Sequence, residues 1–237
     1  MSCVLARPST LGLRGIALLE GLPGERLEAL ARACAWRNYA AGQPIISRAA
    51  ADRDVHLIVS GRVRVTTYSA AGRQVTFRDI AAGELFGEVA AIDGMPRSAD
   101  VVALESALTA SLPAAAFRQL LREEPAVAER VLRRLAGVVR RMSERVIDLS
   151  TLGVHQRIHG ELLRLAREAG VKQNLARIDP APRHADLASQ VSTYREEVTR
   201  ELSALARAGI VSREGRALLI RDVHRLETLV EEVKAGA

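Results

Sequence analysis

The sequence is short of residues on which several classes of protein depend. Among its 237 residues there are only two cysteines, Cys3 and Cys34, too few for an iron–sulfur cluster, a zinc site or a disulfide framework. No stretch reaches the roughly 18 uninterrupted apolar residues that a membrane-spanning helix needs. With 48% hydrophobic and 26% charged residues, the composition excludes wholesale disorder, collagen-like repeats and a membrane bundle. The length suits one large domain or two modest ones.

Lysine is also scarce. Lys172 and Lys234 are the only two, so 32 of the 34 basic residues are arginine, and the 28 acidic residues leave a formal net charge of +6. Arginine binds phosphate and guanine in bidentate fashion better than lysine does. A charge of this size is compatible with nucleic acid or with an anionic ligand and selects neither.

The beginning of the sequence lacks the layout of a signal peptide. Arg14 interrupts the apolar stretch Leu11–Leu19, and no small-residue cleavage site follows it. Together with the small number of cysteines, this predicts a cytoplasmic protein whose thiols stay reduced.

A metal-binding motif is missing as well. Of the five histidines, His155 and His159 lie four residues apart, a spacing that can place two imidazoles on one helical face. No His-Glu-x-x-His pattern or third ligand accompanies this pair. We therefore expect no metal site.

The first half of the sequence has the pattern of a β domain. A short amphipathic helix is expected over 24–34, and from about residue 40 to 112 short apolar runs are separated by glycine turns. Many short strands with regular turns indicate a β-sandwich, a barrel or a roll. The expected strands include His56–Val59, Val63–Thr67, Val75–Arg78, Val101–Leu104 and Leu108–Leu112.

A long helix is predicted next. Pro125 can begin a helix, and no proline or β-turn pair follows before Gly153. The apolar stripe of this helix is close to a heptad repeat, and its opposite face is charged. The stripe could pack on its own domain, but we favour a helix shared between two copies of the chain. Its members are Val131, Leu135, Val138, Met142 and Leu149, and Val146 lies beside the one missing step.

The last part of the sequence has the order of a winged helix-turn-helix. A helical run over Gln156–Ala169 is followed by a polar loop that contains Pro180 and Pro182. Helices over 185–190 and 194–208 then flank a turn, and a hairpin over 210–220 turns at Glu214-Gly215. Two short helices about a tight turn followed by a hairpin are typical of this DNA-binding unit.

The second of these helices carries a candidate base-reading face. Thr193 followed by Glu196 predicts a capping box at its start. The apolar residues of the helix share one side, and the opposite side exposes arginine, glutamate and threonine, which are residue types used in the major groove. The same pattern fits a solvated helix face, but the helix before it and the hairpin after it favour DNA. The candidate residues are Arg195, Glu196, Thr199 and Arg200.

A second candidate site lies between the predicted strands. Arg97 and Ser98 can supply the counter-charge and hydroxyl that a buried phosphate needs, and Glu88 suits sugar hydroxyls. Taken alone, the spacing also fits a surface loop with a Glu88–Arg97 salt bridge.

Two motifs together resemble a known family. Phe86-Gly87-Glu88 followed by Arg97-Ser98-Ala99 resembles the phosphate-binding cassette of cyclic-nucleotide-binding domains. With the long helix and Arg195-Glu196-x-x-x-Arg200, the sequence from about residue 20 to 221 resembles the cyclic AMP receptor (Crp–Fnr) family of bacterial transcription regulators. The resemblance implies an α+β fold with three parts: a cyclic-nucleotide-binding β-roll over 1–124, a dimerisation helix over 125–152 and a winged helix-turn-helix domain over 153–237.

The resemblance also implies a role for each residue of the pocket. Gly87 would offer its backbone near the cyclic phosphate, Glu88 would bind the ribose 2′-hydroxyl, and Arg97 and Ser98 would bind the phosphate. Met142 and Ser143 fall where family members place a Thr-Ser pair that faces the purine. Because Met142 cannot hydrogen-bond as threonine does, the expected ligand is cyclic AMP, cyclic GMP or both.

Function follows from the same resemblance. It implies a homodimer that binds a near-palindromic, TGTGA-like DNA operator when the allosteric nucleotide binds, with RNA polymerase as downstream partner. Sensors of the same family fit less well, because Cys3 and Cys34 cannot form an iron–sulfur cluster and haem would leave the Glu88–Arg97 pair unexplained. An enzyme would need a nucleophile–base pair that the sequence does not offer. A cyclic-nucleotide-binding interaction module that does not bind DNA is a further alternative.

Overall fold

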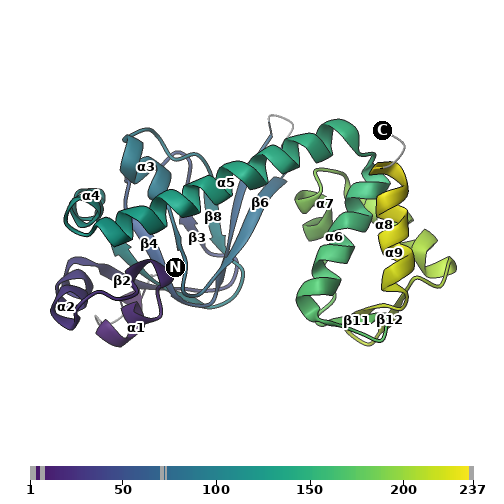
Figure 1. The fold of residues 1–237 in the computed structure, drawn as a ribbon, viewed down its shortest axis with the longest axis horizontal. Coiled ribbons are helices and arrows are strands. Elements are labelled where there is room, and N and C mark those ends of the chain that lie inside the picture. The colour runs from purple at the N-terminus through teal and green to yellow at the C-terminus, as the bar shows by residue number, and fades with distance from the viewer. Residues whose placement is uncertain (1–3, 6–8, 70–71, 73, 235–237) are drawn as a thin grey trace. The chain divides into compact units, whose positions relative to one another are not determined.

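The computed structural model describes residues 4–5, 9–69, 72 and 74–234 (Figure 1). Contacts within the chain group into two compact units, Met1–Val138 and Val139–Ala237. The boundary lies inside helix α5, Pro125–Thr151, so this one helix belongs to both units. None of the helices in these ranges is both long and apolar enough to cross a membrane.

The N-terminal unit is built on two antiparallel sheets, with strand orders β1-β2-β9-β4-β7 and β3-β8-β5-β6. This confirms the predicted α+β fold, and a strand forms in each region where one was expected between residues 56 and 112. The strands are β1 Val4–Leu5, β2 Ala35–Tyr39, β3 Pro44–Ile46, β4 Val55–Ser60, β5 Arg62–Tyr68, β6 Gln74–Ala81, β7 Leu85–Phe86, β8 Asp100–Ala103 and β9 Ala107–Leu112.

Short helices complete this unit, and the helix predicted over 24–34 forms as α2. One apolar cluster packs the helices on the first sheet around the fully buried Phe117, and a second one between the strands contains Ile58, Val63 and Ile80. Apolar burial of this kind is the main force that holds such a unit together. The helices are α1 Thr10–Arg14, η1 Ala17–Leu19, α2 Gly24–Ala33, α3 Glu88–Asp93 and α4 Ala114–Glu123.

The turn between β4 and β5 requires glycine. Gly61 has a φ of +84°, and a Cβ placed on it would lie 2.4 Å from the main-chain oxygen of Ser106. In the register that follows, Val63 pairs with Ile80 and Val65 pairs with Arg78. Arg78 therefore lies on the core-facing side of β6, because side chains alternate along a strand.

Helix α5 forms where it was predicted, but its predicted stripe is only partly right. Val131 is 2% exposed because the core of the N-terminal unit takes it up. The exposed apolar residues lie one position further on: Leu132, Val139 and Val146 are 66%, 64% and 63% exposed, seven residues apart. A second heptad row lies between them, in which Leu135 and Met142 are half-buried and Leu149 is 42% exposed.

The C-terminal unit contains the predicted winged helix-turn-helix, with a four-stranded sheet ordered β10-β11-β13-β12. One expectation is wrong: part of the proline-containing loop pairs as a hairpin, β10–β11. The chain beyond this sheet forms α9, which packs on the same core as α6. The elements are α6 Val154–Ala169, β10 Val171–Lys172, β11 Leu175–Ile178, α7 His184–Gln190, α8 Arg195–Arg207, β12 Val211–Glu214, β13 Ala217–Ile220 and α9 Val223–Lys234.

Candidate functional site

Arg97 is the centre of the first candidate site. It is only 4% exposed. Its Nη1 donates to the main-chain oxygen of Gly87 (3.1 Å) and its Nη2 to that of Asp54 (2.9 Å), while Nη2 also donates to the carboxylate of Asp52. Its Nε is buried and has no hydrogen-bond partner. Because burying an unsatisfied donor costs free energy, this guanidinium is suited to an anion that can accept from it.

Gly87 brings the main chain against this arginine. It precedes α3 with a φ of +87°, in the left-handed region that favours glycine. A Cβ at this position would lie 2.7 Å from Arg97 Nη1 and 2.8 Å from the main-chain oxygen of Asp54. Any side chain here would therefore force the guanidinium to move.

Glu88 is buried, but other arginines than Arg97 balance its charge. Its Oε1 lies 3.6 Å from Nε of Arg134 and 3.9 Å from Nη2 of Arg78. The Glu88–Arg97 salt bridge that the spacing allowed is not formed. The reason is the left-handed turn at Gly87: Arg97 faces the main chain of this turn, whereas Glu88 begins α3 and faces β6 and α5.

Arg134 ties helix α5 to the same loop. Its Nη1 donates to Glu84 Oε2 (2.6 Å) and its Nη2 to the main-chain oxygen of Leu85 (2.5 Å). With a side chain only 16% exposed, it is not part of the solvated charged face that the sequence predicted. Sequence reasoning missed it because its partners lie 49 and 50 residues away.

His56 stacks on Phe86 beside Arg97. The ring centroids are 4.9 Å apart and the planes are nearly parallel. Burial, followed by the positive charge of Arg97, lowers the pKa of His56 to about 4. The imidazole is therefore neutral at neutral pH and adds no charge next to Arg97.

The remaining predicted pocket residues are Ser98, Met142 and Ser143. Ser98 follows Arg97 in sequence but is exposed. Met142 and Ser143 lie on the part of α5 that belongs to the C-terminal unit, where Met142 is half-buried and Ser143 is exposed. Their roles toward a nucleotide stay predictions.

The second candidate site is the outer face of α8. Val198 and Leu205 of this helix are buried, whereas all four predicted DNA-binding residues are exposed. The capping box is wrong: the helix begins at Arg195 behind Tyr194, which has no side-chain capping hydrogen bond. Thr193 is instead 5% exposed, and its N–H donates to Ala188 (2.9 Å), which closes the turn onto α7.

Two of the exposed residues already have partners. Arg200 donates to Glu197, one turn back on α8. The hydroxyl of Thr199 donates to the main-chain oxygen of Arg195 (3.0 Å) and lies 2.8 Å from Nδ1 of His184 on α7. The Thr199 hydroxyl and the Arg200 guanidinium must therefore give up a contact within the protein before they can bind a base.

Positive charges gather around this face. Burial lowers the pKa of His184, and the charges of Arg213 on β12 and Arg195 lower it further. The hairpin thus places an arginine where its charge acts on His184 of α7. Arg213 was not singled out from the sequence, because nothing local distinguishes it from the other arginines.

Comparison with known proteins identifies the family. The sequence matches the models of the cyclic nucleotide-binding domain over residues 36–124 and of the Crp-like helix-turn-helix domain over residues 156–229. It is 31% identical to the cyclic AMP receptor protein of Thermus thermophilus, over 94% of this chain and 99% of that one. The chain belongs to the Crp–Fnr family of transcription regulators. This confirms the resemblance seen in the two motifs.

Further relatives agree with the family but differ in what they sense. The chain is 25% identical to the CRP-like cAMP-activated global transcriptional regulator of Mycobacterium tuberculosis, over 88% of this chain and 94% of that one. Its fold is similar to that of the c-di-GMP responsive regulator CLP of Xanthomonas campestris, with a TM-score of 0.72 at 18% identity, over 84% and 99% of the two chains. This Crp–Fnr protein is thus a DNA-binding regulator with a cyclic-nucleotide-binding domain, not an enzyme.

A cluster of one carboxylate and two histidines holds helix α8 of this Crp–Fnr protein from its inner side. Glu201 on α8 is 7% exposed and accepts from both histidines of the i,i+4 pair on α6. Its Oε1 lies 2.6 Å from Nε2 of His159, and Oε2 contacts Nδ1 of His155. Burial opposes ionisation, but the hydrogen bonds from His159 and His155 outweigh it and hold the pKa of Glu201 below its ordinary value. The histidine pair therefore anchors α8 to α6.

Metal and thiol chemistry find little support in the described parts of the chain. There, no three histidine, cysteine, aspartate or glutamate side chains are arranged to hold a metal ion. Burial, with the charge of Asp54, raises the pKa of the Cys34 thiol to about 12, so its thiolate is not available at neutral pH. Cys3 lies outside the described residues.

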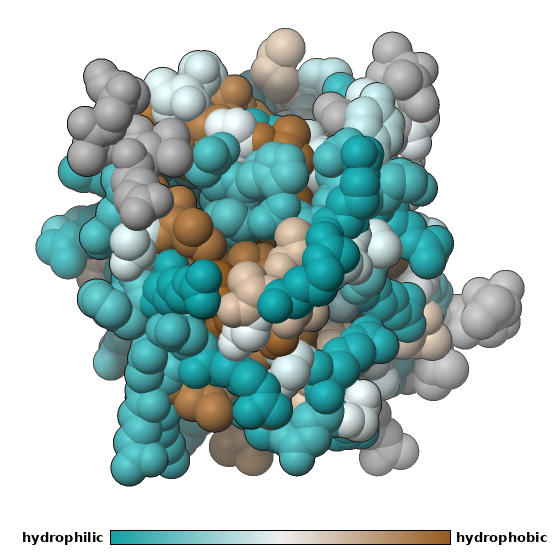
Figure 2. Space-filling view, turned by 90° about the vertical axis from the view of Figure 1, so that its right-hand side faces the viewer, coloured by the Kyte–Doolittle hydropathy of each residue, from teal (hydrophilic) through white to brown (hydrophobic). Residues whose placement is uncertain are grey.

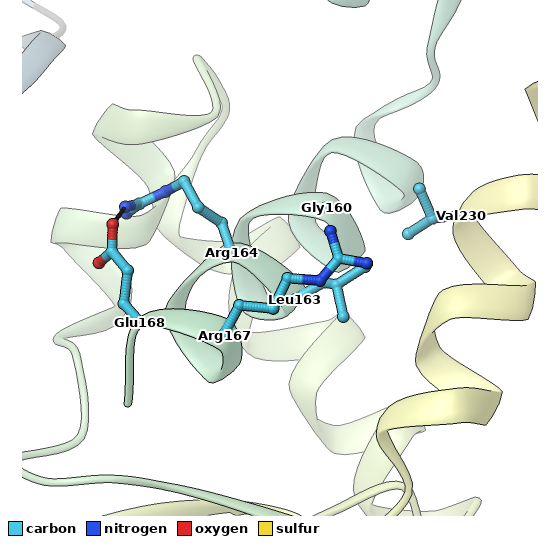
Figure 3. Close-up of a pocket in the computed structure, with 6 residues that line it drawn as sticks. All are labelled: Gly160, Leu163, Arg164, Arg167, Glu168 and Val230. Carbon is cyan, nitrogen blue, oxygen red and sulfur yellow. Dashed lines mark hydrogen bonds and ion pairs between the residues drawn. The ribbon is translucent and has the colours of Figure 1, made fainter. Parts of the chain in front are cut away.

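The surface of the C-terminal unit offers one further hollow. Hydrophilic residues make up most of the face seen in Figure 2, and apolar residues gather between them near its middle. A pocket beside α6 and α9 (Figure 3) is lined by none of the predicted nucleotide- or DNA-binding residues. Its arginines are already paired: Arg164 with Glu161 and Glu168, and Arg167 with Glu227. The lining residues are Gly160, Leu163, Arg164, Arg167, Glu168 and Val230.

Replacing Glu201 by glutamine should loosen α8. We expect the free energy of local opening of α8 to fall by about 1–3 kcal/mol at neutral pH, because two imidazoles lose a charged acceptor. The amide hydrogens of α8 should therefore exchange faster. Since the pKa of Glu201 is lowered, its stabilisation is present above the ordinary glutamate value and fades below it. The ratio of variant to wild-type exchange rates should therefore begin to fall below the ordinary glutamate pKa and keep falling as the pH passes through the lowered pKa of Glu201.

Hydrogen exchange followed by mass spectrometry measures this ratio, in which the intrinsic pH dependence of exchange cancels. Glu231→Gln removes an exposed carboxylate from α9 of the same unit and serves as control. A ratio for Glu201→Gln that is the same at pH 3 and at pH 7 would contradict the charged anchor.

Proposed function

We propose that this protein is a homodimeric transcription regulator that binds a near-palindromic, TGTGA-like operator when cyclic AMP, cyclic GMP or both bind to its N-terminal unit. The observation that carries the proposal is Arg97, a buried guanidinium with an unsatisfied donor beside the main chain of Gly87. The proposed working parts are a nucleotide-binding domain over 1–124, a dimerisation helix over 125–152 and a DNA-binding domain over 153–237. RNA polymerase is the proposed downstream partner.

In the nucleotide site, Arg97 and Ser98 bind the phosphate, Gly87 supplies main-chain contact and Glu88 binds the ribose hydroxyl. The position of Glu88, buried near Arg134 and Arg78, supports this, because a carboxylate oxygen can accept from a hydroxyl. Met142 and Ser143 are proposed to face the purine. Relatives described as cAMP-activated favour cyclic AMP.

Another effector is the main alternative. The similar fold of a c-di-GMP responsive regulator shows that this architecture serves more than one effector. Within the proposal, the loss of threonine at position 142 leaves the purine undecided between adenine and guanine.

At the DNA, Arg195 and Arg200 are proposed to donate to guanine and Glu196 to accept from cytosine, with Thr199 in support. The exposure of all four residues on α8 supports this, as does the charge of Arg213, which acts on His184 of the neighbouring helix α7. Two such helices in one dimer would enter successive major grooves, about 34 Å apart.

The dimer is proposed to form along α5. Two heptad rows support this: Leu132, Val139 and Val146 in one, and Leu135, Met142 and Leu149 in the other. Exposed apolar residues that repeat every seven positions are the pattern of a coiled-coil seam. The nucleotide would act allosterically by favouring one arrangement of this seam.

Arg97→Ala tests the nucleotide site. We expect nucleotide affinity to fall by about 2–5 kcal/mol, because the phosphate loses its buried counter-charge. Isothermal titration calorimetry with cyclic AMP and cyclic GMP measures this, and a mobility-shift assay with and without each nucleotide tests the regulation. Arg53→Ala, which removes an exposed arginine of a neighbouring loop, should bind as the wild type does. Unchanged affinity in Arg97→Ala, or DNA binding that ignores both nucleotides, would overturn the proposal.

Arg200→Ala tests base reading. We expect a loss of about 1–3 kcal/mol on the preferred half-site and little loss on a half-site changed at the contacted base pair, so that specificity relaxes there. Fluorescence anisotropy against a panel of single-base half-site variants measures both. Arg207→Ala, in the last turn of the same helix, is the matched control. An equal loss on every half-site would mean that Arg200 contacts only phosphate.

Val139→Glu tests the dimer seam. We expect the variant to sediment as a monomer at concentrations at which the wild type is a dimer, because the change places a charge in each of two facing helices. Analytical ultracentrifugation measures this. Glu144→Lys changes charge on the same helix outside both rows and should leave the dimer intact. A Val139→Glu variant that stays fully dimeric would move the interface elsewhere.

A further inference from the structure

The carboxylate of Asp52 accepts a hydrogen bond from one N–H donor of the Arg97 guanidinium. A guanidinium has five N–H donors and no acceptor. In Arg97, two donors bind the main-chain oxygens of Gly87 and Asp54, and one binds Asp52. The main-chain contacts belong to the framework, because Gly87 and the segment before β4 hold them in place. Asp52 is the one side-chain anion among these partners.

Asp52 approaches Arg97 from the solvent side. The side chain of Arg97 is 2% exposed, whereas that of Asp52 is 51% exposed. Partial burial opposes ionisation of Asp52, but the hydrogen bond and the charge of Arg97 outweigh it and lower the pKa of this carboxyl. The carboxylate is therefore ionised at neutral pH. Because the side chain is half exposed, Asp52 can turn into water, where its own charge is solvated.

The match between Asp52 and Arg97 is incomplete. The carboxylate accepts at Nη2, while Nε of the same guanidinium is buried with no partner. A phosphodiester has the same single charge as a carboxylate but presents two free oxygens in a tetrahedral arrangement. Such a group can accept from more than one donor of an arginine.

We propose that Asp52 is an internal competitor for the phosphate of the effector, which must displace this carboxylate from Arg97 to bind. The proposal rests on the assignment of Arg97 to a cyclic nucleotide. Two anions held at one guanidinium repel each other, so the phosphate and the carboxylate exclude one another. Asp52 thereby lowers nucleotide affinity and sets the concentration at which the regulator responds.

The substitution Asp52→Asn separates the effect of the negative charge of this side chain from the effect of its shape. Asp52→Asn keeps an oxygen that can accept from Arg97 but removes the negative charge. We expect nucleotide affinity to rise by about two- to fivefold for cyclic AMP and cyclic GMP alike, the size of a part-exposed ion pair. Isothermal titration calorimetry on the full-length protein measures this. Glu28→Gln, which removes an exposed carboxylate from the same unit, controls for net charge and should leave affinity unchanged.

The outcomes are distinct. Tighter binding by Asp52→Asn alone supports the competition. Affinity within about twofold of the wild type, or weaker binding in a variant whose melting temperature is unchanged, overturns it but leaves the proposed function intact. If neither the wild type nor the variants bind either nucleotide, the proposed function fails and the competition fails with it.

A second measurement follows Asp52 itself. Carbon-13 NMR of the aspartate carboxyls, assigned with Asp52→Asn, gives the pKa of Asp52 with and without nucleotide. Displacement predicts that cyclic AMP raises this pKa toward the ordinary aspartate value, because the carboxylate loses Arg97 as its partner. A pKa that stays low while the nucleotide is bound would show that Asp52 keeps its contact and would overturn the proposal.

Discussion

The positive charge of Arg97 is the constraint around which the N-terminal unit is arranged. A guanidinium that is 4% exposed must find partners nearby, and it finds two main-chain oxygens and one carboxylate. The carbonyl of Gly87 can reach it only because this residue has no side chain and a left-handed backbone. The same turn sends Glu88 away from Arg97 toward Arg134 and Arg78. One buried cation therefore fixes the loop, the turn and the direction in which the neighbouring carboxylate faces.

Helix α5 connects this loop with the recognition unit, because it is the element that the two units share. Arg134 binds the loop before α3 within the N-terminal unit, and Arg145 donates to Ser192 in the turn between α7 and α8 within the C-terminal unit (3.0 Å). Ser192 has a φ of +56°, so this contact is made at the strained point of the turn. A rotation or shift of α5 would act on the loop before α3 and on the turn before α8. Its heptad rows lie on the same helix, so the proposed dimerisation, nucleotide binding and DNA reading would all use α5.

The sequence predicted the features that depend on neighbouring residues. Glycine turns, alternating strands and the period of α5 are local, so the fold class and both candidate sites were found, and Gly87 and Arg97 belong to one motif. Residues whose partners are far along the chain were missed. Asp52 lies 45 residues before Arg97, and Glu201 lies 42 residues after His159. The pair His155 and His159 was visible, but the carboxylate that it holds was not. Val131 was misassigned because an apolar stripe does not say which of two cores will take up each residue.

The charges on α8 show why net charge was a poor guide to function. Glu201 faces inward and is held by hydrogen bonds from α6, so it anchors the helix and is not part of its exposed face. Glu197 pairs with Arg200 on the surface, which partly offsets an arginine proposed to read DNA. An exposed pair of this kind is weak and can exchange for a stronger bidentate contact with guanine. The inner charges thus fix where α8 sits, while the outer charges stay exchangeable. Such a division suits a helix that must hold its shape and still release one partner for another.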